Sequence, residues 1–106
     1  MKRISSHAEF VKLKKNGIRK RTPYFDVVTT TADRDGDFGL AIIVTRKTAN
    51  AVKRSKLKRW FRNFAHLNSQ LFKADHNYLI ICKKGIFNYG REQIYNDLTS
   101  FLESTD

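Results

Sequence analysis

Positively charged side chains are concentrated in two segments of this chain. Residues 38–74 hold nine Lys and Arg residues and no Asp or Glu, and residues 1–23 hold eight more beside a single acid, Glu9. Over all 106 residues, 21 Lys and Arg stand against 10 Asp and Glu, which gives a net charge of +11. A surface that serves only solubility mixes the two signs. The segregation therefore predicts a binding surface for a polyanion such as a nucleic acid.

The densest cationic segment, residues 46–62, has helical spacing that separates charged from apolar residues. At about 100° per residue, one side carries Leu57, Trp60, Phe61, Phe64 and Leu71. The opposite side carries Ser55, Lys58, Arg59, Arg62 and His66, with Lys56 beside them.

Three interpretations of this charged side compete. A solvated helix face normally includes glutamates four residues from its lysines, whereas here Lys58 and Arg62 form a like-charge pair at that spacing. A helix lying on a membrane would need the apolar side, which the rest of the fold has to bury. Phosphate binding is the interpretation that the pattern favours.

The loop before this helix strengthens the prediction of phosphate binding. Arg46, Lys47 and Thr48 lead into Asn50, a residue type that caps helix N-termini well. The first amides of a helix, with the positive end of its dipole, attract phosphate oxygens. Arginine can grip phosphate through two parallel hydrogen bonds, and lysine acts as a point charge.

The surrounding pattern predicts one α+β domain over residues 1–106, built as a two-layer sandwich of a mostly antiparallel sheet and three helices. A capping box at Ser6 and Glu9 begins the first helix, which Gly17 ends. Strands are expected at residues 24–31 and 38–45, joined by a hairpin at Asp35-Gly36. A helix over residues 50–72, a strand over 78–83 and a helix over 88–103 follow, with residues 18–21 as a candidate fourth strand.

The residues that could form other kinds of site are poorly placed for them. The three histidines have no metal-ligand partner at helical spacing, and the three aspartates fit a turn better than a calcium loop. The lone cysteine fits a buried strand and a reducing cytoplasm. The apolar runs are too short to cross a bilayer, and no short helix precedes the long one as in DNA-binding repressors. We therefore expect no catalytic residue, no bound metal or cofactor, no membrane or DNA partner, and a cytoplasmic location; the residues concerned are His7, His66, His76, Asp33, Asp35, Asp37 and Cys82.

Residues 46–62 read RKTANAVKRSKLKRWFR, and this run resembles the signature of the bacterial ribonuclease P protein family. That signature is a basic residue, then Lys-x-Gly-Asn-Ala-Val-x-Arg-Asn-Arg, a hydrophobic residue, and Lys-Arg-x-x-Arg. The match has no gap, and the order of the other elements agrees over nearly the whole chain.

The resemblance implies a protein subunit that binds a catalytic RNA, while that RNA uses Mg²⁺ to cleave precursor tRNA at the mature 5′ end. It also implies a four-stranded sheet, three helices and a left-handed βαβ crossover. The residues expected to contact the catalytic RNA are Arg46, Lys47, Asn50, Lys53, Arg54, Lys56, Lys58, Arg59 and Arg62.

A second surface, formed in the family by the first helix and the sheet, binds the single-stranded 5′ leader of precursor tRNA. Aromatic faces stack on any base, and basic groups follow the strand's backbone. Two positions that are aromatic in the family are Lys14 and Val28 here, which shifts the expected binding from stacking towards charge. The residues expected to bind the leader are Phe10, Lys14, Lys12, Arg3 and Val28.

The signature departs from the family pattern at Ala49, Ser55 and Lys56, where the family has Gly, Asn and Arg. The family's Asn lies near a metal-ion site, so its replacement by Ser55 argues against a Mg²⁺ ion held by this chain. Composition alone also leaves open a structural RNA-binding module, such as a ribosomal protein or an RNA assembly factor.

Overall fold

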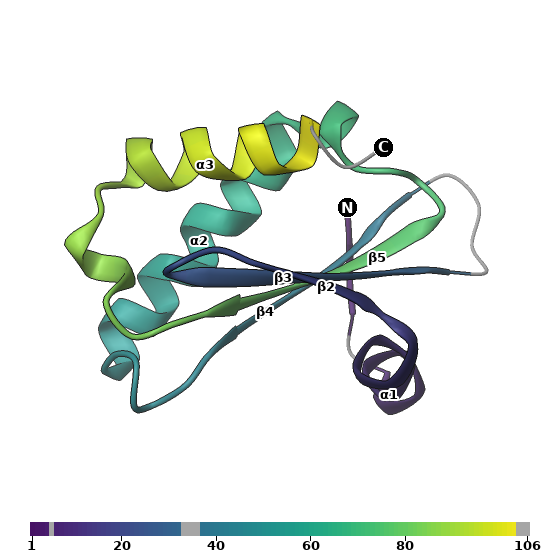
Figure 1. Ribbon diagram of the computed structural model, residues 1–106, viewed down its shortest axis with the longest axis horizontal. Helices are drawn as coiled ribbons and strands as arrows, with labels where there is room; N and C mark the ends of the chain where they lie inside the picture. The colour runs from purple at the N-terminus through teal and green to yellow at the C-terminus, as the bar shows by residue number, and fades with distance from the viewer. Residues whose placement is uncertain (5, 33–36, 104–106) are drawn as a thin grey trace.

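The computed structural model describes residues 1–4, 6–32 and 37–103 (Figure 1). Over these residues the chain forms five strands, three α-helices and two short 3₁₀ helices. The strands are β1 (Lys2–Arg3), β2 (Ile18–Arg21), β3 (Phe25–Thr31), β4 (Gly39–Val44) and β5 (His76–Cys82). The helices are α1 (His7–Asn16), α2 (Ala51–Leu67), η1 (Ser69–Leu71), η2 (Ile86–Asn88) and α3 (Arg91–Glu103).

The strands form one mixed sheet in the order β1-β4-β5-β3-β2. β4 runs parallel to both β1 and β5, whereas β3 runs antiparallel to both β5 and β2. The α+β class and the candidate strand at Ile18–Arg21 are confirmed. The expectation of a mostly antiparallel sheet of three to four strands is wrong, because β1 adds a fifth strand and half of the pairings are parallel.

The predicted hairpin between β3 and β4 is also wrong. Both strands pair with β5, which lies between them along its whole length. Asp35 and Gly36, the predicted turn, lie outside the described residues. β5 can occupy the centre because its apolar residues alternate between the two sheet faces and are largely buried on both.

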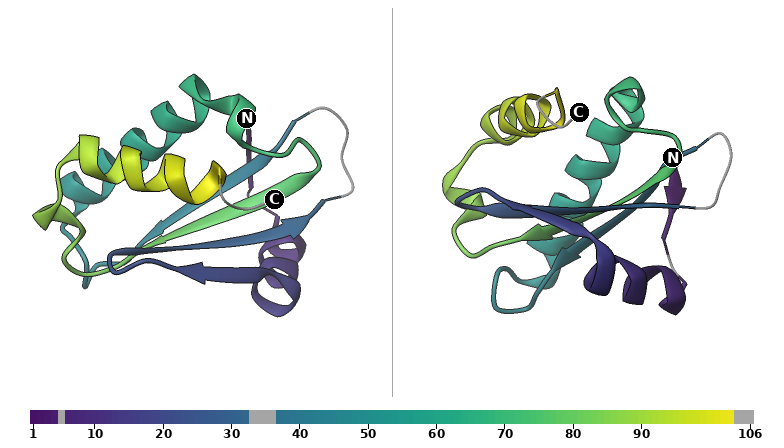
Figure 2. Two further views of the ribbon diagram at one scale, coloured as in Figure 1. Left: turned by 45° about the horizontal axis from the view of Figure 1, so that its top comes forward. Right: turned by 45° about the vertical axis from the view of Figure 1, so that its right-hand side comes forward.

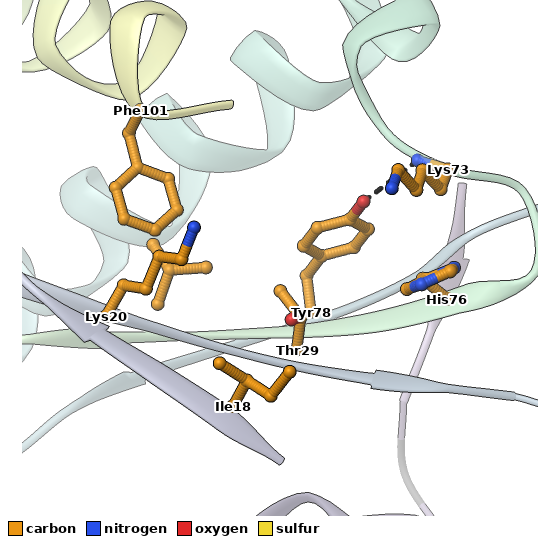
Figure 3. Close-up of a pocket in the computed structure, with 8 residues that line it drawn as sticks. Ile18, Lys20, Thr29, Lys73, His76, Tyr78 and Phe101 are labelled. Carbon is orange, nitrogen blue, oxygen red and sulfur yellow. Dashed lines mark hydrogen bonds between the residues drawn. The ribbon is translucent and has the colours of Figure 1, made fainter. Parts of the chain in front are cut away.

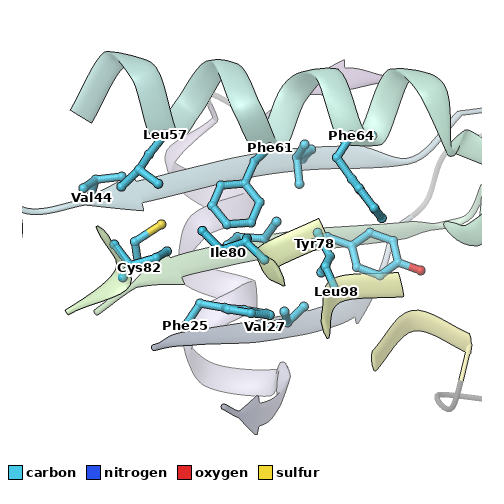
Figure 4. Packing of buried hydrophobic residues seen from close by; sticks show 14 of the residues in the cluster. Phe25, Val27, Val44, Leu57, Phe61, Phe64, Tyr78, Ile80, Cys82 and Leu98 are labelled. Atoms are coloured by element: carbon cyan, nitrogen blue, oxygen red, sulfur yellow. The ribbon is translucent and has the colours of Figure 1, made fainter. Parts of the chain in front are cut away.

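Helices cover both faces of the sheet, so the two-layer prediction is wrong. α2 and α3 lie on one face and α1 on the other (Figures 1 and 2). Under α2 and α3, Leu57, Phe61 and Phe64 pack on the large core (Figure 4), which confirms the predicted apolar side of the long helix. A smaller core under α1 contains Ile4, Leu13, Val28 and Leu79.

α1 is held on its face of the sheet by backbone and side-chain contacts. Ser6 is the N-cap residue as predicted, but its side chain makes no capping hydrogen bond. Glu9 accepts a hydrogen bond of 2.9 Å from the buried Asn77 of β5, which ties the first turn to the sheet. At the other end, Gly17 donates to the Leu13 carbonyl and ends the helix where predicted.

α2 ends five residues before the predicted boundary. The Asn68 side chain and backbone amide both donate to the Phe64 carbonyl, at 3.0 Å and 2.9 Å, and the chain then tightens into η1. α3 begins at Arg91 rather than residue 88, because the preceding residues form η2. The Tyr95 hydroxyl of α3 donates to the Trp60 carbonyl at 2.6 Å and so fixes α3 against α2.

Candidate nucleic-acid interface

The loop before α2 is a tight turn that presents two cations. Backbone amides of Thr48 and Ala49 donate to the Thr45 carbonyl, and the two threonine hydroxyls lie 3.1 Å apart. Arg46 and Lys47 are exposed at this turn. The Thr48 hydroxyl therefore supports the turn.

The N-terminus of α2 has the predicted cap. Asn50 accepts a hydrogen bond of 2.9 Å from the Lys53 amide, and Arg54 donates one of 3.0 Å to the Ala49 carbonyl. Arg54 thereby joins the helix to the turn while it keeps its positive charge. The first-turn amides lie at the helix N-terminus, directly after the turn that carries the loop cations, and such amides attract anions.

The basic residues of α2 are accessible along the length of the helix. Lys53, Lys56 and Arg59 are exposed, and Arg54, Lys58 and Arg62 are half-buried. Lys53 lies over the ring of Phe87 at 5.3 Å. Lys56 lies over the ring of Trp60 at 5.1 Å. These cation–π contacts hold the two ammonium groups over the rings, while both lysines stay exposed.

The carboxylates that form ion pairs among the described residues lie away from α2. In the described part of the chain, the ion pairs join Asp26 to Arg19 and Lys83, Asp37 to the N-terminal ammonium, and Asp75 to His76. None of these pairs includes a basic residue of α2 or of the preceding loop. We call the nine residues predicted to contact the catalytic RNA the cationic surface; among the described residues it has no neutralising carboxylate.

A groove of about 490 Å³ runs between α2 and the N-terminal strand. Its α2 residues recur at helical spacing, and Met1 and Arg3 supply the other wall; the α2 residues are Ser55, Arg59, Arg62, Asn63 and His66. Burial and the positive charge of Arg3 together lower the pKa of Arg62. The sequence prediction omitted Asn63, although it follows Arg59 by four residues and so lies on the same side of the helix.

The residues predicted to bind a leader are only partly brought together. Phe10 on α1, half-buried against the smaller core, lines a hollow with Arg3 and Arg62. Lys14, one turn further along, lines the next hollow with Val28, which is itself buried. Phe10 and Lys14 thus follow one side of α1 above Val28, and Arg3 lies at the edge of the sheet, on β1.

Lys12 lies apart from this group. Its ammonium donates a hydrogen bond of 2.8 Å to the Thr31 carbonyl, and it lines a different hollow with Lys2 and Glu9. In a helix, residue 12 is turned about 200° from residue 10, so it faces the other flank of α1. Its contact with β3 helps to position the helix.

A further pocket, of about 170 Å³, lies on the face of the sheet that carries α2 and α3 (Figure 3). Tyr78 and Phe101 contribute aromatic rings, but both are already engaged. The ammonium of Lys20 lies 5.7 Å from the Phe101 ring centre, and the Tyr78 hydroxyl accepts a hydrogen bond from the Lys73 amide. Both rings of this pocket therefore already make contacts within the protein.

No group of three or more His, Cys, Asp or Glu side chains that could hold a metal occurs within the described ranges. Cys82 is buried in β5 as predicted, and burial raises the pKa of its thiol to about 12, which leaves too little thiolate for a nucleophile at neutral pH. None of the helices described is long and apolar enough to cross a membrane.

Comparison with known proteins identifies the family of this chain. The family model for ribonuclease P matches residues 1–106. The ribonuclease P protein component of Geotalea uraniireducens is 33% identical over 101 residues, which cover 95% of this chain and 88% of that protein. The component from Syntrophus aciditrophicus is 38% identical over 82 residues, covering 76% of this chain and 67% of that protein.

Solved structures give the same result for the fold. The ribonuclease P protein of Staphylococcus aureus superimposes with a TM-score of 0.87 at 27% identity, covering 97% of this chain and 94% of that one. The protein of Thermotoga maritima has the same TM-score at 24% identity and covers 100% and 99% of the two chains. The chain therefore belongs to the ribonuclease P protein family, the protein subunits of the endoribonuclease that processes the 5′ leader of tRNA.

Proposed function

We propose that this subunit binds the catalytic RNA of ribonuclease P through the cationic surface and the 5′ leader of precursor tRNA through α1 and the adjoining sheet. The observation that carries the proposal is the cationic surface itself, which lacks a neutralising carboxylate among the described residues, in a chain of this family. An unneutralised row of cations is self-repulsive until an anion lies against it.

The contacts with the catalytic RNA are of two kinds. The turn with Arg46 and Lys47 and the amides that begin α2 suit a phosphate at the helix N-terminus. Further along, Arg59 and Arg62 can each grip a phosphate in the groove, while the lysines add charge over a wider area. Such contacts recognise the shape of a folded RNA backbone and are independent of base sequence.

The leader would lie along the side of α1 that carries Phe10 and Lys14. Phe10 offers one half-buried ring for a base, and Lys14 and Arg3 can follow the backbone. Val28 is covered by α1 and supports the floor of this site by packing. Lys12 contributes to leader binding only through its general positive charge, because its ammonium is bonded to β3.

In this proposal the chemistry of cleavage resides in the RNA, which uses Mg²⁺, and the protein supplies binding energy and position. Ser55, in the groove, has one hydroxyl where the family signature has an amide, so we assign no Mg²⁺ to this chain. We also propose the family's left-handed sense for the β4–α2–β5 crossover, and a cytoplasmic location alongside the RNA.

Reconstitution tests the proposal. Purified protein is combined with a bacterial ribonuclease P RNA and labelled precursor tRNA at a Mg²⁺ concentration that leaves the RNA alone slow. Faster cleavage and tighter binding of leader-bearing than of mature tRNA are expected. Equal affinity for ribosomal RNA fragments, without any effect on cleavage, would instead identify a structural RNA-binding module.

A further inference from the structure

The two-residue strand β1 brings Arg3 to α2. Its pairing with β4 places Arg3 opposite Leu40, and the amides of Lys2 and Ile4 donate to the carbonyls of Phe38 and Leu40 at 2.9 Å and 3.1 Å. Successive side chains of a strand point to opposite faces. Since Ile4 is buried in the core under α1, Arg3 is directed away from that core. The hydrogen bonds of the residues before and after it thus fix the backbone of Arg3.

Two hollows meet at Arg3 and Arg62. One is the groove of about 490 Å³ along α2, which contains Arg59 and His66. The other, of about 130 Å³, leads to Phe10 on α1. Met1, Arg3 and Arg62 line both of them. The surface expected to bind a leader and the groove of α2 are therefore continuous, and they join at a pair of guanidinium groups.

This pair of guanidinium groups is electrostatically unbalanced. Within the described residues, no ion pair includes Arg3 or Arg62, and Asp37 pairs with the N-terminal ammonium at 2.7 Å. The pKa of Arg62 is lowered by burial and by the charge of Arg3, which is the direction that uncompensated repulsion produces. An anion between the two groups would remove the repulsion and would accept hydrogen bonds from both.

We propose that Arg3 and Arg62 together bind one phosphodiester of the precursor tRNA leader, at the point where the strand passes from the Phe10 hollow to the groove of α2. This inference rests on the proposed function. It adds a phosphate site that the Phe10 hollow and the groove of α2 share. A phosphodiester fits because it carries a single charge with two free oxygens, one for each guanidinium. Arg62, counted above with the catalytic RNA, is thereby assigned to the leader, while Arg59 keeps its contact with the catalytic RNA.

The test maps individual leader phosphates in the reconstituted holoenzyme. Precursor tRNAs carrying one neutral methylphosphonate at successive leader positions are bound to holoenzyme with wild-type, Arg3→Ala, Arg62→Ala or doubly substituted protein. The readout is the ratio of affinity for precursor to that for mature tRNA at saturating protein, which removes any effect on binding to the catalytic RNA. Arg91→Ala, an exposed arginine of α3, is the matched control.

For wild-type protein, one methylphosphonate position is expected to lower the ratio about tenfold, the loss typical of hydrogen bonds between charged groups. Each single variant should lower the ratio for the native leader by about tenfold and abolish sensitivity at that same position. In the double variant, the fold-loss in this ratio should be smaller than the product of the two single fold-losses. Arg3→Lys, which keeps the charge without the paired donors, should lose only part of the effect.

The inference is overturned if the two variants lose sensitivity at different phosphates, if their losses multiply, or if neither changes the ratio. The proposed function fails separately, when wild-type protein gives no leader-dependent gain at all. Thermal unfolding of each variant confirms that the readout comes from folded protein, and Arg3→Lys provides the same test should Arg3→Ala unfold.

Discussion

Asp26 of β3 is the carboxylate whose removal has the most predictable consequence. It is 1% exposed and accepts hydrogen bonds from the Arg19 Nε and Nη2 atoms at 2.9 Å and 2.6 Å, while the Lys83 ammonium lies 2.6 Å from its other oxygen. Lys83 also donates to the Thr22 carbonyl, so the cluster joins β2, β3 and the end of β5. Asp26→Asn keeps the shape of the side chain but removes the charge.

The expected cost of Asp26→Asn at pH 7 is about 2–3 kcal/mol of unfolding free energy. Removing one partner of a fully buried pair costs about 3–5 kcal/mol. Here the side chains of Arg19 and Lys83 are 46% and 34% exposed and can regain water, which lowers the figure. In a domain of this size such a loss lowers the Tm by about 10–20 °C.

The pH dependence gives the sharper test. Burial opposes ionisation of Asp26, but the hydrogen bonds from Lys83 and Arg19 outweigh it, so the pKa lies below its usual value. A lowered pKa stabilises the fold above the unfolded value, near pH 4, and this contribution is lost as the pH falls through the folded pKa. The difference between wild type and Asp26→Asn should therefore shrink progressively below about pH 4.

Urea unfolding at a series of pH values, from about 2.5 to about 7, measures this difference. Circular dichroism follows the unfolding at each pH. Asp75→Asn is the control, because that carboxylate is exposed and, among the described residues, forms its ion pair with its neighbour His76. The stability of this variant should scarcely differ from that of the wild type. Equal urea midpoints for wild type and Asp26→Asn at pH 7, or a difference that persists undiminished at the lowest pH, would refute the reasoning.

Two further predictions concern the elements that position the interface. Gly17→Ala should lower stability by about 1–3 kcal/mol in urea unfolding, because the added Cβ would lie 2.3 Å from the Leu13 carbonyl oxygen and 2.4 Å from Val28 Cγ1; an unchanged midpoint would contradict the close approach of α1 to β3. Asn50→Ala should cost about 1 kcal/mol through loss of the cap on the Lys53 amide, with Asn50→Asp nearly neutral in the same assay; equal losses in both variants would contradict the capping role.

The sequence was a good guide wherever the pattern was local and periodic. The apolar side of α2 and its cap at Asn50 follow directly from spacing and residue type, and the structure has both. The cationic side follows in the same way, since whatever does not pack must face solvent. Asn63 follows from the same helical spacing, because it lies four residues after Arg59 and lines the same groove. The prediction omitted it because charge was the guide along this side of the helix.

Sheet order could not be obtained from local pattern, because it depends on pairing between distant segments. Asp35-Gly36 is a good turn signal, yet β4 pairs with β5 in preference to its neighbour in sequence. A usable signal was present: the continuous apolar run from Tyr78 to Cys82 in β5 indicates a strand covered on both faces, which argues against a two-layer sandwich. β1 has no such signal, since two charged residues become a strand only through their pairing with Gly39 and Leu40.

In the candidate site, too, local relations could be predicted from the sequence and relations between distant segments could not. The cationic residues of α2 share one helix, so their relation is visible in the sequence. Arg3 and Arg62 come from segments 59 positions apart, and only the β1–β4 pairing brings them to one groove. Lys12 shows the opposite case, because it lies close to Phe10 in sequence but lines a hollow on the other flank of the helix.

The most direct test of phosphate binding by the cationic surface is the salt dependence of affinity for the ribonuclease P RNA. Each phosphate neutralised releases counterions, so a plot of log affinity against log salt is expected to fall steeply, and Arg59→Ala should flatten its slope by about one unit. The control Arg91→Ala should leave the slope unchanged. A wild-type affinity that is insensitive to salt, or an equal slope in Arg59→Ala, would contradict binding through this surface.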